Sequence, residues 1–143
     1  MQPSTAFRLV LMLSLASALV GTVFIAQRES LLPSGLIEYL AEAAPDPEAP
    51  PTTKQRAARY AGTGFLIAYL AVIAGMFFFK KWARPVGLLV TATSFIVHPL
   101  NGPIIDSGWG VLFFDLASVL WGAMLAMSYC PPCSGLFAKE PNA

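Results

Sequence analysis

The chain has 143 residues, of which 56% are hydrophobic and only 12% are charged, and its mean hydropathy is +0.63. A soluble globular domain carries about twice that share of charged residues. Because the hydrocarbon core of a bilayer cannot solvate charge, this composition predicts an integral membrane protein in contact with the lipid bilayer. The net charge of +1 excludes the strongly basic surface that nucleic-acid binding requires.

The first apolar stretch runs over residues 7–26 and contains one charge, Arg8. About 20 residues of helix cross a hydrocarbon core of ~30 Å, so this stretch predicts a first membrane span. A cleaved signal peptide is the alternative, because Ala16, Ser17 and Ala18 resemble a cleavage site. We favour a retained helix, since apolar sequence continues for two more turns beyond that site.

A long connection follows, and residues 30–52 are expected to form an external loop that is part amphipathic and part proline-rich. From Ser34 to Ala44, apolar residues recur at helical spacing opposite two glutamates, which predicts a short amphipathic helix on the membrane surface. The next segment, PDPEAPP, predicts an extended linker because proline cannot continue a helix. Thr52 and Gln55 then match a capping box, so the following helix is expected to begin near Thr53.

Three further spans are predicted at residues 60–79, 86–100 and 109–129. The second span ends on three phenylalanines followed by lysines, a pattern typical of a membrane interface. Trp121, within the fourth span, is interpreted as a packed or lipid-facing residue. The sequence therefore predicts an all-α fold: an integral membrane four-helix bundle with a short amphipathic interfacial helix in its first external loop, forming a single membrane domain over residues 1–143.

The distribution of cations in the short loops predicts the orientation in the membrane. The loop between the second and third spans carries three cations, whereas the loop between the third and fourth carries Asp106 and no lysine or arginine. The positive-inside rule then places both termini, including the tail of residues 130–143, in the cytoplasm. Three cations just before the second span, at 54, 56 and 59, oppose this assignment. The expected location is a bacterial inner membrane.

Small residues recur at steps of three and four along the last three spans. Because lipid is as apolar as leucine, helices in a membrane associate where small residues let their backbones approach closely. The predicted helix-packing residues are Gly64, Ala68, Ala71 and Gly75 in the second span, Gly87 in the third, and Gly122 and Ala126 in the fourth.

Polar residues lie at the same steps in the third and fourth spans: Thr91, Ser94, His98, Asp115 and Ser118. If these two spans form an antiparallel hairpin, all five side chains should meet inside the bundle, in the half that lies toward the external side of the membrane. A carboxylate within a span costs ~3 kcal/mol on insertion scales, so it needs a partner or a task. The five residues are interpreted either as a ligand or proton site or, as we favour, as a structural hydrogen-bond cluster that locks the hairpin.

Cys130 and Cys133 have the C-x-x-C spacing of thiol oxidoreductases and of half a zinc site. Cys130 follows a helix C-terminus, where the dipole disfavours the reactive thiolate. A structural zinc site also needs four ligands, and the only histidine is expected at the opposite membrane surface. We favour two reduced thiols in a cytoplasmic tail over a metal or redox site, and no cofactor is predicted.

The sequence contains no nucleotide-binding loop, zinc-protease helix or nucleophile elbow. We therefore expect a non-catalytic membrane component or subunit that binds a membrane-protein partner or forms a homo-oligomer. The alternative hypothesis is a transporter of a small molecule or ion, or a thiol-dependent metal or redox protein, that uses the polar cluster or the cysteine pair.

Overall fold

The computed structural model describes residues 2–43, 50, 52–97 and 105–138. Every regular element in this part of the chain is helical, which confirms the all-α class. The elements in chain order are α1 (Pro3–Ala26), α2 (Arg28–Leu31), α3 (Ser34–Ala43), α4 (Thr53–Phe77), α5 (Ala83–Val97), α6 (Gly108–Tyr129) and the 3-10 helix η2 (Cys133–Phe137).

Within the described residues, three helices are long and apolar enough to cross a membrane: Pro3–Ala26, Arg59–Phe77 and Gly108–Tyr129. At 1.5 Å per residue, the 22 residues of α6 extend about 33 Å, which matches a hydrocarbon core of ~30 Å. The 15 residues of α5 extend only about 22 Å. The chain is therefore a membrane protein with three to four helices that could span the bilayer.

The ends of the helices follow local chemistry. The structure confirms a helix that begins at Thr53, after the predicted capping box, and a short helix from Ser34. Pro3 occupies the first turn of α1, where its missing N–H costs nothing. The hydroxyl of Ser107 caps α6 by accepting a hydrogen bond of 3.2 Å from the Gly110 N–H. Most of the proline-rich linker lies outside the described residues.

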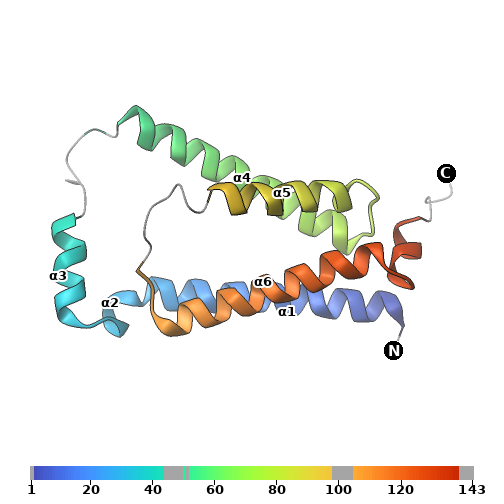
Figure 1. The fold of residues 1–143 in the computed structure, drawn as a ribbon, viewed down its shortest axis with the longest axis horizontal. Coiled ribbons are helices and arrows are strands. Elements are labelled where there is room, and N and C mark those ends of the chain that lie inside the picture. Colours follow the sequence, from blue (N-terminus) through green and yellow to red (C-terminus); the bar gives the residue numbers. More distant parts are fainter. Residues whose placement is uncertain (1, 44–49, 51, 98–104, 139–143) are drawn as a thin grey trace.

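The long helices form two pairs, α1 with α6 and α4 with α5 (Figure 1). The pairs meet at the end that holds the start of α1, the turn at residues 78–82 and η2, which we call the junction end. They separate toward the end that holds α2, α3 and the first residues of α4 and α6, which we call the splayed end (Figure 1).

The α1–α6 pair packs along small residues. Ser14, Ser17 and Gly21 are buried on α1, and Gly110 and Ala117 are buried on α6. A Cβ added at Gly21 would lie 2.9 Å from the ring of Phe114, and the Ser14 hydroxyl donates a 2.9 Å hydrogen bond to the Ala117 carbonyl. We expected α6 to pack mainly against α5, as a close hairpin of the third and fourth spans, and this expectation is wrong. Helix α6 packs along α1, because α1 offers the better fitting face of small residues.

The turn between α4 and α5 is unusually tight. A Cβ added at Gly75 would lie 2.7 Å from the Cβ of Ala83, so only glycine permits this approach. Helix α4 ends in a Schellman motif, in which the Lys80 N–H bonds the Gly75 carbonyl and the Phe79 N–H bonds the Met76 carbonyl. Phe79 holds the left-handed position, at φ 54°, where glycine is usual. This conformation costs about 1 to 2 kcal/mol for a residue with a Cβ, so packing must offset it.

Candidate functional site

Three phenylalanine rings at the junction end offset the cost of the left-handed backbone at Phe79. Phe79 packs at centroid distances of 5.5 Å from Phe7 and 5.4 Å from Phe137, and these two are themselves 5.5 Å apart. Phe7 and Phe137 are fully buried. This ring triad joins α1, the α4–α5 turn and η2, so it holds the two helix pairs together.

Two guanidinium groups cover the triad. Arg8 lies 4.8 Å from the Phe77 ring centroid and 5.1 Å from that of Phe79, and its Nε donates to the Phe77 carbonyl. Arg84 lies 4.3 Å from the Tyr129 centroid and 5.4 Å from that of Phe137. Such cation–π contacts satisfy the flat face of a guanidinium and leave its N–H edge free for other acceptors.

A second contact ties the helix pairs together deeper in the molecule. The Trp121 indole donates a 2.9 Å hydrogen bond to the Thr91 hydroxyl, and the Tyr69 ring lies 4.8 Å from the indole. Trp121 is 7% exposed, so it is packed and does not face lipid. Thr91 therefore finds its partner in an indole, and this cross-helix hydrogen bond was missed by the sequence interpretation.

The structure does not bring the predicted polar cluster together. The Ser94 and Ser118 hydroxyls donate to carbonyls of their own helices, those of Thr91 and Phe114. The Asp115 side chain is exposed on α6, contrary to the expectation that it points into the bundle. The reason is that α6 turns its opposite face toward α1. His98 lies outside the described residues.

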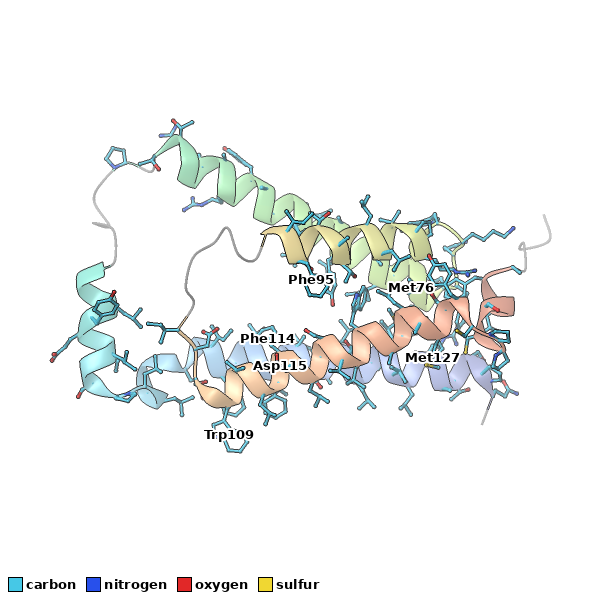
Figure 2. The ribbon with its side chains drawn as sticks, in the orientation of Figure 1. Met76, Phe95, Trp109, Phe114, Asp115 and Met127 are labelled. Carbon is cyan, nitrogen blue, oxygen red and sulfur yellow. The ribbon has the colours of Figure 1, made fainter. Side chains whose placement is uncertain are left out.

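The exposed face of α6 instead carries a polar and small stripe at helical spacing: Asp115, Ser118, Gly122 and Ala126. The Asp115 carboxylate forms no hydrogen bond or ion pair with any part of the chain that the structure describes. Figure 2 shows it on the stretch of α6 where the two helix pairs have separated, beside Phe114 and level with Phe95 of α5. A Cβ added at Gly122 would meet no atom within 4 Å.

The remaining predicted packing residues divide into two groups. Gly75 and Gly87 lie at close helix contacts, since an added Cβ would approach Ala83 and Leu125 to 2.7 and 3.1 Å. Ala68 is half-buried against the core. In contrast Gly64, Ala71 and Ala126 are exposed, so any packing role for them would need a second chain.

The cysteine pair is split between two environments. Cys130 is exposed, whereas Cys133 is 4% exposed and its thiol donates to the Pro3 carbonyl over 3.8 Å. Both are free thiols. Across the described residues, no group of three His, Cys, Asp or Glu side chains is placed to hold a metal ion. The geometry thus gives Cys133 a packing role between α1 and η2.

Comparison with protein-family models, with curated proteins and with solved structures finds no match to this chain.

Proposed function

We propose that the protein is a non-catalytic membrane component that associates laterally with a second transmembrane chain through the exposed face of α6. The observation that carries this proposal is the exposed Asp115 carboxylate, which lies about 5 Å along the axis from the midpoint of an apolar helix. A carboxylate facing hydrocarbon costs ~3 kcal/mol on insertion scales. A hydrogen-bond donor on a neighbouring chain would offset that cost.

The residues around Asp115 suit a helix–helix contact. Gly122 and Ala126 follow it on the same face and would let another backbone approach closely, as small residues do in membranes. The simplest neighbour is a second copy of this chain, because a twofold pair would bury both stripes with one set of contacts. Another membrane protein is the alternative partner.

In the same proposal all four long helices cross a bacterial inner membrane, with both termini in the cytoplasm. The start of α1, the α4–α5 turn and η2 lie at one end of the molecule, as an even number of crossings requires (Figure 1). The cations Lys80 and Lys81 in that turn favour the cytoplasmic side under the positive-inside rule.

The experiment measures association of the full chain in membranes, by energy transfer between two differently labelled copies in vesicles. We expect wild type to associate and Gly122→Leu to weaken association at least tenfold, because the added side chain blocks close approach. Ala123→Leu is the matched control, since it enlarges the neighbouring exposed position about 100° around the helix. Equal effects of the two substitutions would refute the assigned face.

A second comparison identifies what Asp115 contributes. Asp115→Asn keeps the ability to hydrogen-bond and should retain association, whereas Asp115→Leu should lose it. If no variant alters energy transfer, copurification of wild type and Gly122→Leu from native membranes tests the other partner class. A protein that is lost only from the Gly122→Leu preparation would then be that partner, and identical preparations would reject lateral association altogether.

A further inference from the structure

Cations and acids separate between the two ends of the molecule. Four cations lie in the described part of the junction end: Arg8, Lys80, Lys81 and Arg84. In the described part of the chain, the acidic residues lie instead in α2, in α3, at Asp106 two residues before α6, and in α6 itself. Among the described residues, Arg8, Lys80 and Arg84 form no ion pair, so the junction end keeps a positive field.

Arg8 and Arg84 are held in place by aromatic rings and still have N–H groups that form no hydrogen bond with the described residues. Each guanidinium lies over aromatic rings, and neither forms an ion pair within the described chain. The Nε of Arg84 is buried and bonds no acceptor. A guanidinium with a covered face and a free N–H edge matches the paired oxygens of a phosphate group.

Exposed aromatic residues give the depth of these cations. Trp82 lies two residues before Arg84, and Tyr129 is the ring that Arg84 covers; they are 47% and 42% exposed. Exposed tryptophan and tyrosine at helix ends favour the level of the lipid headgroups. The arginine side chains would then reach the depth of the lipid phosphates, while the aromatic rings that they cover stay in the apolar part of the membrane.

We infer that the junction end binds the phosphodiester headgroup of an anionic phospholipid, through Arg84 and Arg8 with Lys80 at the rim. Basic sites between helices on the cytoplasmic side of a membrane are suited to such headgroups. The bound lipid would accept from the Nη groups of the two arginines, since the Arg8 Nε donates to the Phe77 carbonyl and the Arg84 Nε is buried. This inference rests on membrane insertion and not on lateral association.

The test uses the full chain in nanodiscs of phosphatidylcholine alone or mixed with phosphatidylglycerol. Native mass spectrometry measures which lipid stays bound, and thermal unfolding measures the stabilisation that it gives. We expect wild type to retain phosphatidylglycerol preferentially. Each lost cation should lower that preference about fivefold, for Arg84→Gln and Lys80→Gln alike. Since Lys80 is exposed, its variant keeps the test valid if Arg84→Gln fails to fold.

Three outcomes would overturn the assignment. The control Arg59→Gln removes an exposed cation near the splayed end, and an equal loss of preference there would mean a general charge effect. Arg84→Lys keeps the charge but loses the planar fork, so its lipid preference should fall between those of wild type and Arg84→Gln, and wild-type preference in Arg84→Lys would refute recognition by the guanidinium. Equal stabilisation by inorganic phosphate in phosphatidylcholine would identify free phosphate as the ligand.

Failure of lipid binding at the junction end can be distinguished from failure of lateral association. Gly122→Leu changes α6 far from the cations and should keep the lipid preference. Arg84→Gln should keep energy transfer between copies. Loss of both properties in both variants would point to general unfolding, which the thermal measurement detects and which would leave neither proposal standing.

Discussion

The junction end and the splayed end differ in the contacts that their charged and aromatic side chains make. At the junction end, aromatic rings cover two arginines and three separate elements share one buried triad. Toward the splayed end, Asp115 has no partner in the described chain and Phe95 of α5 is 75% exposed. The difference indicates that the junction is where the two helix pairs hold each other, and that the faces that separate toward the splayed end are available to lipid or to other chains.

Removal of a ring from the triad is expected to have the largest effect on stability. Phe137→Ala should lower the free energy of unfolding by about 3 to 5 kcal/mol, because it leaves a cavity beside the fully buried Phe7 ring and the half-buried Phe79 ring. Phe95→Ala is the matched change on an exposed ring and should cost much less. Unfolding in nanodiscs, followed by tryptophan fluorescence, measures both. Similar losses would mean that the two ends are equally important.

A smaller effect is expected where α4 and α5 approach each other. Gly75→Ala should cost about 1 to 3 kcal/mol, since its Cβ would overlap that of Ala83 and overpacking forces backbone shifts. Gly64→Ala on the same helix meets no atom within 4 Å and should be neutral or slightly stabilising. The same unfolding assay compares them. A destabilising Gly64→Ala would reveal a contact at the splayed end that one chain does not make.

The smallest expected effect concerns the hydrogen bond between α1 and α6. Ser14→Ala removes the donor to the Ala117 carbonyl and should cost about 0.6 kcal/mol, the average for hydrogen bonds between membrane helices. Thr22→Ala removes a hydroxyl that bonds only within its own helix and should cost less. A cost of several kcal/mol for Ser14→Ala would place more of the stability in the α1–α6 pair than in the junction.

Local signals in the sequence were sufficient to find most of the helices. The capping box located the start of α4 at Thr53, and the alternation of apolar and acidic residues located α3. The first span begins at Pro3 and not at Phe7, because polar residues near the N-terminus also continue the helix. These features depend on a few neighbouring residues and so can be predicted from one sequence.

The pairing of helices could not be predicted in the same way. The steps of three and four that mark Ser14, Ser17 and Gly21 also mark the small residues of the other spans, and spacing alone does not choose among them. The choice depends on shape, such as the fit of the Phe114 ring against Gly21. That is why α6 packs along α1 and leaves Asp115 on the opposite face.

The junction had no local signature at all. Phe79 has a left-handed conformation at a position where glycine is usual. No residue near it in sequence predicts its contacts with the rings of Phe7 and Phe137. The run of phenylalanines and lysines predicts a membrane interface, and a prediction from composition contains nothing about the contacts that the residues make. A triad built from three distant segments becomes visible only in the folded chain.

The composition of the ring triad also fixes when the protein can finish folding during its synthesis. Its three rings come from α1, from the α4–α5 turn and from η2, the last element that the structure describes. A ribosome delivers these segments in that order, so the first two must wait in the membrane until residues 133–137 emerge. Until then the packing that offsets the left-handed backbone of Phe79 lacks the Phe137 ring, so the α4–α5 turn reaches its full stability only once η2 is in place.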